Sequence, residues 1–237
     1  MIFEAGNLYH IYNQGNNRQK IFFSNDNYLY FLTKFKEHIL PHADILAWCL
    51  MPNHFHLMVY VHSVDVTISD SMTPSHTITG NAPPSDSMTL SHTITGNTSP
   101  SDSMTPSHTI TGGSAPKIRT FNESIGLLLR SYTRAVNLKE NRTGSLFKPH
   151  TKAECITKME GITPSFYNTL SGTVINRQMI EKEYPQVCFD YIHNNPVKAG
   201  LAEQQEEWIY SSYCDLKGLR NGKLINKRRI EEFGIKF

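Results

Sequence analysis

Two histidines separated by a single residue, His54 and His56, are the part of this sequence best suited to chemistry. They lie in the run LMPNHFHLMVYV of residues 50–61, which is typical of a β-strand. Because side chains alternate between the two faces of a strand, both imidazoles point to one face and could bind one metal ion there. The alternative is a pair of structural histidines with no metal.

Periodicity predicts the elements that would position these histidines. Alternating and short apolar runs predict strands over residues 7–14, 45–51, 54–61 and 145–156. Apolar residues at helical spacing predict helices over residues 26–39, 122–141 and 184–194. Asn195 and Pro196 are expected to end the last helix. This order is typical of a ferredoxin-like fold, an α+β architecture with helices on one face of an antiparallel sheet.

Tyr132 belongs to the apolar stripe of the helix predicted over residues 122–141, and this stripe is expected to face the sheet. A tyrosine in such a stripe is usually part of the core, with its hydroxyl bonded to a neighbour. The functional interpretation is nucleophilic. A metal ion that neutralises the charge on a phosphate makes a phenol competent to attack phosphorus, which leaves a covalent phosphotyrosine.

Residues 69–116 are three near-identical copies of a 16-residue unit of the form SDSMTPSHTITG followed by a short variable end. Each copy has too few apolar residues to offset the entropy of ordering it, so we interpret the segment as a flexible insertion in a single domain of residues 1–237. His76, His92 and His108 recur with aspartates, and an alternative is a metal-binding array or a short β-solenoid.

The charge of the chain permits nucleic-acid binding without requiring it. The formal net charge is +2, and because the repeats contain three Asp and no Lys or Arg, the remaining residues carry +5. Basic residues gather in residues 217–237, which we interpret as a basic C-terminal tail. Such a tail could contact phosphates or simply be solvated.

Cysteine spacing and hydropathy favour a cytoplasmic protein without a membrane segment. No apolar run approaches the roughly 18 residues needed to cross a bilayer. The cysteines are widely spaced and form no CxxC pair, as is usual for reduced thiols. They are Cys49, Cys155, Cys188 and Cys214.

Several segments resemble the single-tyrosine HUH transposases, and especially their REP-associated members. The matching segments are YHIYNQGNNRQKIF at 9–22, AWCLMPNHFHLMVYV at 47–61, LLRSYTRAVN at 128–137, RTGSLF at 142–147, YIHNNPVKAGL at 191–201 and WIYSSY at 208–213. Their order also matches the family. The resemblance covers most of residues 6–214 outside the repeats, and residues 157–183 match poorly.

The resemblance implies a ferredoxin-like catalytic domain that cuts single-stranded DNA, often beside a hairpin, with Mg2+ or Mn2+. His54 and His56 match the metal ligands, and Tyr132 matches the family tyrosine on the helix after the HUH strand. The implied reaction is transesterification, in which the Tyr132 oxygen attacks the scissile phosphate, a 5′-phosphotyrosine forms and a 3′-hydroxyl is released. Monomers and homodimers both occur among such transposases, so the resemblance leaves the assembly open.

The resemblance leaves the third metal ligand open. A ligand would be expected one turn from Tyr132, but that position is Val136. Asn137 lies about 140° around the helix from Tyr132 by the 3.6-residue period. Water, Asn137 or a residue near the C-terminal helix therefore all remain candidates.

The turn after the first predicted strand is a candidate DNA contact. Asn16, Asn17 and Arg18 offer amides and a guanidinium suited to a phosphate or an unpaired base, and the alternative is an ordinary turn. Two other functions are consistent with the residues. One is a non-catalytic single-stranded nucleic-acid-binding module of the same fold. The other is a zinc hydrolase, which would need a further His or carboxylate near residues 54–61.

Overall fold

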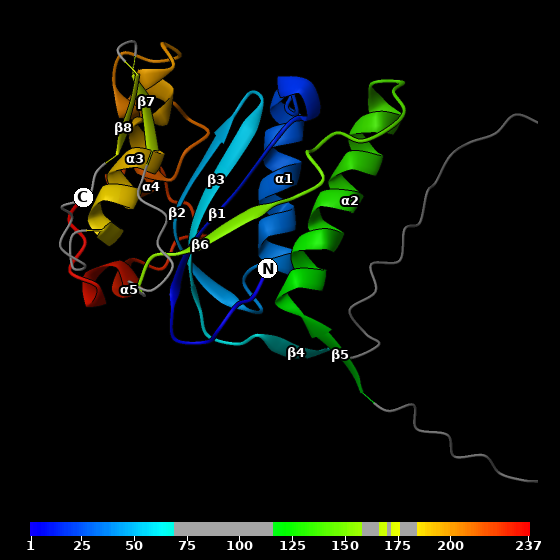
Figure 1. The fold of residues 1–237 in the computed structure, drawn as a ribbon, viewed down its shortest axis with the longest axis horizontal. Helices are drawn as coiled ribbons and strands as arrows, with labels where there is room; N and C mark the ends of the chain where they lie inside the picture. Colours follow the sequence, from blue (N-terminus) through cyan, green and yellow to red (C-terminus); the bar gives the residue numbers. More distant parts are fainter. Residues whose placement is uncertain (69–115, 158–165, 170–171, 176–183) are drawn as a thin grey trace, which may run out of the picture. The chain divides into compact units, whose positions relative to one another are not determined.

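The computed structural model describes residues 1–68, 116–157, 166–169, 172–175 and 184–237 (Figure 1). One compact unit contains Met1–Thr67 and Ile118–Phe237. A second unit, Ile68–Lys117, holds the repeats and lies almost wholly outside the described residues, so the predictions made for the repeats stay predictions.

A four-stranded antiparallel sheet lies at the centre of the larger unit, in the order β2-β3-β1-β6. Its strands are β1 (Leu8–Gln14), β2 (Ala43–Met51), β3 (His54–Val61) and β6 (Lys152–Cys155). Helix α1 (Asn25–His38) joins β1 to β2, and helix α2 (Phe121–Lys139) lies between β3 and β6 in the chain. This order is the ferredoxin-like connectivity, and the predicted fold class is confirmed.

Capping residues set where the two helices begin. Ser24 and Asn27 form a capping box at the start of α1, and Thr120 and Glu123 form one at the start of α2. Each box satisfies backbone N–H groups that have no partner inside the helix. Helix α1 therefore begins at Asn25, one residue before the predicted start.

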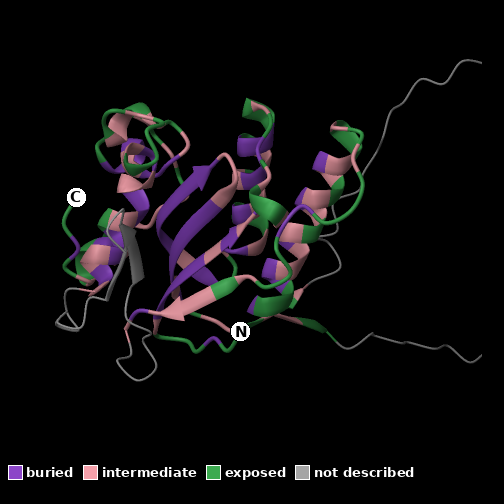
Figure 2. Ribbon diagram, turned by 45° about the horizontal axis from the view of Figure 1, so that its top comes forward, coloured by how far each residue is buried: buried purple, intermediate pink, exposed green. Residues whose placement is uncertain are grey.

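Helices α1 and α2 cover one face of the sheet, on which alternate residues of β3 are buried. Phe55 and Leu57 lie in this core with Phe31 of α1 and Leu128 of α2. The strands of the central sheet are largely buried, whereas α1 and α2 have both buried and exposed faces (Figure 2). Two short pairs of strands stand apart from the central sheet. They are β4 (Asp65–Ile68) with β5 (Lys117–Thr120), and β7 (Phe166–Thr169) with β8 (Gly172–Ile175).

The opposite face of the sheet is covered as well, which corrects the expectation of helices on one face only. Helix α3 (Tyr184–Lys198) packs there, together with the short helices η4 (Gln205–Glu207), α4 (Tyr213–Leu216) and α5 (Lys227–Glu232) (Figure 1). Met58 of β3 is buried against Phe189 and Ile192 of α3. The sequence between Tyr184 and Phe237 therefore forms a second layer rather than an appendage.

Two predicted boundaries are wrong. Helix α3 continues through Pro196 to Lys198 instead of ending at Asn194, because the carbonyls of Asn195 and Pro196 still accept from the amides of Ala199 and Leu201. The strand predicted over residues 145–156 is limited to Lys152–Cys155. Pro149 has no N–H to donate to a ladder, which accounts for the irregular backbone before β6.

Residues 217–237 are not a solvated tail. Ile230 and Ile235 are buried beside the sheet, and the Arg229 Nε lies 3.0 Å from Asp44 Oδ2 on β2. Arg220 forms a 2.6 Å ion pair with the buried carboxylate of Asp215. Two arginines of this segment, Arg220 and Arg229, are therefore paired with carboxylates of the protein itself.

No helix in the described part of the chain is both long and apolar enough to cross a bilayer.

Candidate active site

The side chains of His54 and His56 lie on the same face of β3, as their spacing predicts. In the structure, α3 covers this face. Phe55 and Leu57 point to the other core, under α1 and α2. His56 is buried and His54 is half-buried. The alternation of β3 thus separates an apolar face from a face that carries imidazoles.

Each of these imidazoles uses its Nδ1 atom in a hydrogen bond within the protein. His56 Nδ1 lies 2.9 Å from Nε2 of His10, a residue of the neighbouring strand β1. His54 Nδ1 lies 2.6 Å from Oδ1 of Asn53. Hydrogen bonds of this kind fix the orientation of a metal-binding histidine and leave its Nε2 as the nitrogen available to a ligand.

Burial keeps all three imidazoles in their neutral form. It lowers the pKa of His10 to about 4. The pKa of His56 falls well below its ordinary value because of burial first, and then because of its histidine neighbours. Burial also lowers the pKa of His54, opposed by a hydrogen bond with Asn195. Neutral imidazole is the form that binds metal ions.

Helix α3 brings two more functional side chains to these histidines, Tyr191 and Asn195. They are four residues apart and therefore share one face of the helix. The Tyr191 ring lies edge-on to the His56 ring, with 5.3 Å between ring centroids, and 6.1 Å from the His10 ring. Asn195 lies near enough to His54 to oppose the lowering of the His54 pKa by burial. Asn195 Nδ2 is buried and has no hydrogen-bond partner in the part of the chain that the structure describes.

Charged and phenolic groups surround Tyr191. Lys198 Nζ lies 5.6 Å from the centre of the Tyr191 ring. Tyr12, which pairs directly with His56 across β1 and β3, donates a 2.7 Å hydrogen bond to Glu154 of β6. The face of the sheet under α3 is thus polar at this end, although it is apolar around Met58.

The donor atoms at this site fit a divalent cation. Within the described residues, no three His, Cys, Asp or Glu side chains come together as a metal site. His54, His56 and the Asn195 amide would instead offer two imidazole nitrogens and one neutral oxygen. Imidazole favours transition metals, whereas Mg2+ prefers an all-oxygen shell, so this donor set suits Mn2+ better than Mg2+.

The helix stripe that contains Tyr132 faces the sheet, as expected, but it packs on the face opposite to His54 and His56. The Tyr132 ring is fully buried among aromatic residues of the α1–α2 core, 4.7 Å from Phe31. Its hydroxyl donates a 2.7 Å hydrogen bond to the carbonyl oxygen of Ile21. Burial raises the pKa of Tyr132, which disfavours the phenolate. This geometry is that of a structural tyrosine.

Asn137 is also remote from the histidines. It lies near the end of α2, where its Nδ2 donates a 2.8 Å hydrogen bond to the carbonyl of Gly144. Helix α2 packs on the face of the sheet opposite α3, and nothing in this placement supports Asn137 as a metal ligand.

The candidate DNA-binding turn lies beside the histidine strand. The short helix η1 (Asn16–Arg18) has positive φ at Asn17 (51°) and at Arg18 (59°), and both of these side chains are exposed. Gly15 donates a 2.8 Å hydrogen bond to the carbonyl of Asn53, the residue that holds His54. A Cβ atom at Gly15 would lie 2.1 Å from the Gln19 carbonyl oxygen, so only glycine fits there.

Tyr191 and Asn195 are the functional candidates that our sequence analysis did not single out. Their motif, YIHNN, was available as a segment of the resemblance, and the i, i+4 spacing on a predicted helix was a usable signal. The missing information was which helix covers the histidine face.

No family model matches this chain, and no curated protein matches it. Among solved structures, it is similar to one described as a REP-associated tyrosine transposase bound to a REP hairpin. The identity is 14%, the match covers 95% of this chain and 92% of that chain, and the TM-score is 0.47. A likeness at this level does not establish membership of a family.

Proposed function

We propose that this protein is a transposase-type strand transferase that cleaves and rejoins single-stranded DNA, with Tyr191 as its nucleophile. The observation that carries this proposal is the contact between the Tyr191 ring and His56, on the one face of the sheet where both strand histidines lie. The resemblance of the sequence segments to HUH transposases supports the reaction class. It does not decide which tyrosine reacts.

The chemistry is a displacement at phosphorus. The Tyr191 oxygen attacks the scissile phosphorus, the bond from phosphorus to the 3′ oxygen breaks, and a 5′-phosphotyrosine forms. The phenolic proton passes to water, and the departing 3′ oxygen gains a proton to become a hydroxyl. Rejoining is the reverse displacement by a 3′-hydroxyl, which regenerates the tyrosine.

His54, His56 and Asn195 would hold a divalent cation beside this tyrosine. When bound, such a cation supplies a Lewis acid that offsets the negative charge building on the phosphate. The protein's own contribution is positioning. Tyr191 is carried by a helix packed on the sheet, so the oxygen approaches the phosphate from a fixed direction.

Three further residues, from the turn and from α3, would hold the DNA strand. Arg18 and Asn17 are exposed in the turn that packs against Asn53, next to His54. Lys198 lies over the Tyr191 ring, one further turn along the same face of α3 from Asn195. These residues would bind phosphates on either side of the scissile bond.

Covalent trapping tests this proposal directly. The full chain is incubated with labelled hairpin-bearing oligonucleotides and Mn2+, and adducts are separated under denaturing conditions. We expect one adduct, which peptide mapping by mass spectrometry assigns to Tyr191. A protein that binds these oligonucleotides with no adduct under any metal would instead be the non-catalytic binding module, and the transferase proposal would fail.

A further inference from the structure

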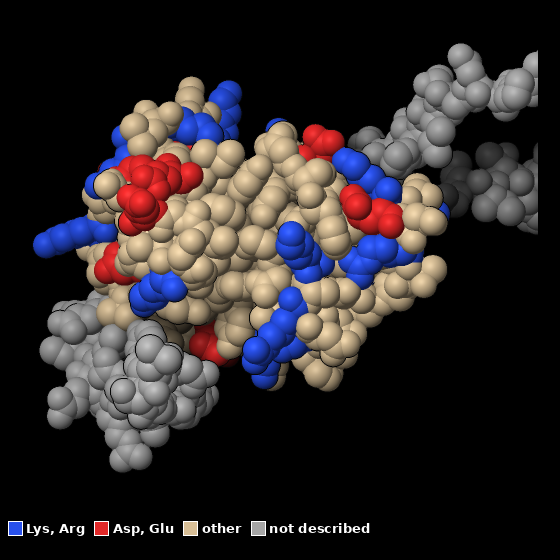
Figure 3. Space-filling view, turned by 90° about the horizontal axis from the view of Figure 1, so that it is seen from above, with Lys and Arg blue, Asp and Glu red and all other residues tan. Residues whose placement is uncertain are grey.

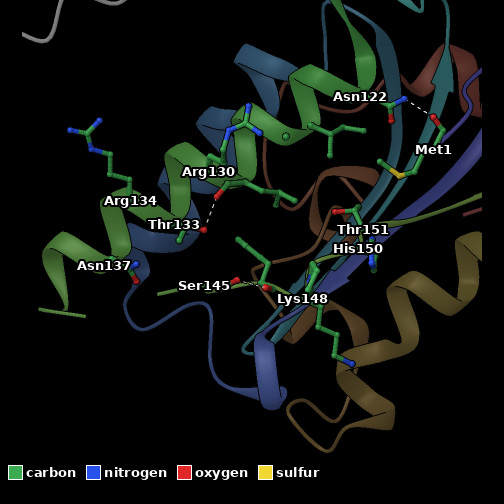
Figure 4. A pocket seen from close by; sticks show the side chains of 15 residues that line it. Met1, Asn122, Arg130, Thr133, Arg134, Asn137, Ser145, Lys148, His150 and Thr151 are labelled. Carbon is green, nitrogen blue, oxygen red and sulfur yellow. Dashed lines mark hydrogen bonds between the residues drawn. The ribbon is translucent and has the colours of Figure 1, made fainter. Parts of the chain in front are cut away.

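A groove runs along the outer side of α2, between that helix and the segment of residues 145–151 (Figure 4). It has a volume of about 730 Å3, within the range of ligand pockets. Because α2 packs on the sheet face opposite α3, this groove is separate from the candidate active site. Neither Tyr191 nor Asn195, the nucleophile and the third metal ligand of the proposed reaction, lines the groove.

The rims of the groove are positively charged. Arg130 and Arg134 are four residues apart on α2, which places them about 6 Å apart along the helix axis. Lys148 and His150 lie on the facing segment, across the groove (Figure 4). No Asp or Glu is among the described residues that line it.

Within the described ranges, the arginines and the lysine of the groove have no carboxylate partner. Among the described residues, none of the ion pairs involves Arg130, Arg134 or Lys148, and all three are exposed. This contrasts with Arg220 and Arg229, which are engaged by Asp215 and Asp44. Arg130, Arg134 and Lys148 are therefore available to an external anion.

The floor of the groove is apolar. Ile125 and Phe147 are buried there, and Leu129 is half-buried between them and the rim. A rim of cations around an apolar floor suits a ligand that carries both phosphates and flat apolar rings. Single-stranded nucleic acid has this chemistry, because its unpaired bases expose their faces.

Asn137, at one end of the groove, adds a hydrogen-bond acceptor. Its Nδ2 is fixed by the carbonyl of Gly144, and its Oδ1 has no hydrogen-bond partner within the described residues. Buried polar atoms are seldom left without a partner in folded proteins. An amino group on the edge of a base is the kind of donor that would satisfy this oxygen.

Seen from above, lysine and arginine side chains occur at the left, in the middle and at the right of this face, and acidic side chains occur at the left and at the upper right (Figure 3).

We propose that the groove between α2 and residues 145–151 binds a segment of single-stranded nucleic acid, with Arg130, Arg134 and Lys148 on its phosphates. The bases lie toward Leu129 and Phe147. Binding in this groove does not require strand cleavage, so the proposal does not depend on the reaction proposed above.

Binding measurements on a charge-matched pair of variants test this proposal. The first variant, Arg130→Gln with Arg134→Gln, removes the guanidiniums and keeps good helix formers at both positions. The second, Lys36→Gln with Lys223→Gln, removes the same charge from exposed residues outside the groove. Fluorescence anisotropy with labelled oligothymidylate is recorded over a series of salt concentrations. An oligouridylate arm distinguishes DNA from RNA.

We expect the groove variant to lose about tenfold in affinity at low salt, and the slope of log K against log salt to fall by about 1.4, because each lost phosphate contact on a single strand removes about 0.7. The control variant should keep the wild-type slope. Unchanged affinity in the groove variant, or equal losses in both variants, would overturn the proposal. Because anisotropy does not depend on cleavage, a chain that forms no adduct can still show this effect.

Asn137→Asp gives a second measurement that leaves the arginines in place. It puts a negative charge at the end of the groove where the strand is proposed to lie. We expect weaker oligonucleotide binding at temperatures where the variant is folded, and a somewhat lower thermal stability because the hydrogen bond to the Gly144 carbonyl is lost. Wild-type affinity in this variant would exclude Asn137 from the path of the strand.

Discussion

The edge of the Tyr191 ring meets the face of His56 at an interplanar angle of 82°, with 5.3 Å between ring centroids. The two residues are far apart in sequence, and they meet because α3 crosses the sheet on the face that carries the strand histidines. Tyr132, in contrast, is separated from His56 by the sheet itself. The first prediction follows from this difference.

Tyr191→Phe should abolish the covalent DNA adduct, because it removes only the attacking oxygen and keeps the ring. Tyr132→Phe is the matched control. It removes the hydrogen bond to the Ile21 carbonyl and should cost about 1 kcal/mol of stability while the adduct still forms. Adduct yields are compared by denaturing electrophoresis, and unfolding is followed by thermal denaturation. An adduct that survives in Tyr191→Phe and vanishes in Tyr132→Phe would reverse the assignment.

The proposed metal ligands give a second prediction. His54→Ala, His56→Ala and Asn195→Ala should each weaken the Mn2+ dependence of cleavage, and EDTA should suppress the wild-type reaction, because the phosphate loses its Lewis acid. Isothermal titration with Mn2+ measures the affinity without any DNA. Asn195→Asp is the informative variant, since a charged oxygen ligand should raise the affinity for Mg2+ relative to Mn2+. If Asn195→Ala binds Mn2+ as the wild type does, the amide is not a ligand.

His10 should act as a support for His56 rather than as a ligand. It lies 2.9 Å from His56 Nδ1, and removing such a partner typically costs 10–100-fold in metal affinity. We therefore expect His10→Phe to weaken Mn2+ binding within about that range while cleavage at saturating Mn2+ stays measurable. Complete loss of metal binding would instead make His10 a direct ligand.

The repeats give a prediction about the insertion. Loop-closure free energy changes by only about 0.6 kcal/mol for each doubling of loop length, and β4 pairs with β5 at the two ends of the segment. Deleting residues 69–116 should therefore leave thermal stability and oligonucleotide binding nearly unchanged. A deletion variant that does not fold would show that the repeats take part in the structure, as the β-solenoid alternative implies.

The ion pair of Asp215 should be important for stability. Its carboxylate is buried, accepts from Arg220 and is also bonded by the Gly222 amide. Asp215→Ala should lower the free energy of unfolding by about 3 kcal/mol, since it leaves these donors without an acceptor. Asp26→Ala, which removes an exposed ion pair with Lys139, is the matched control and should cost less than about 1 kcal/mol. Chemical denaturation of both variants measures the difference.

Periodicity was sufficient to predict most of the central sheet. β3 agrees with its predicted bounds, and β1, α1 and α2 agree to within two residues, because each buries one regular face against the core. The segment before β6 was mispredicted as a strand. Its apolar residues Leu146 and Phe147 are buried, but their backbone is irregular. Tertiary contacts hold that segment in place, and these contacts leave no periodic pattern.

The sequence by itself determined the spacing of His54 and His56, and with it the fact that both imidazoles share one face of a strand. It also determined the amphipathic pattern of each helix. Only the tertiary structure decided which helix covers which face of the sheet. An apolar stripe packs equally well on either face, because burial of apolar surface has no direction. The long-range contacts of α3, and not the pattern of α2, therefore place Tyr191 rather than Tyr132 beside the histidines.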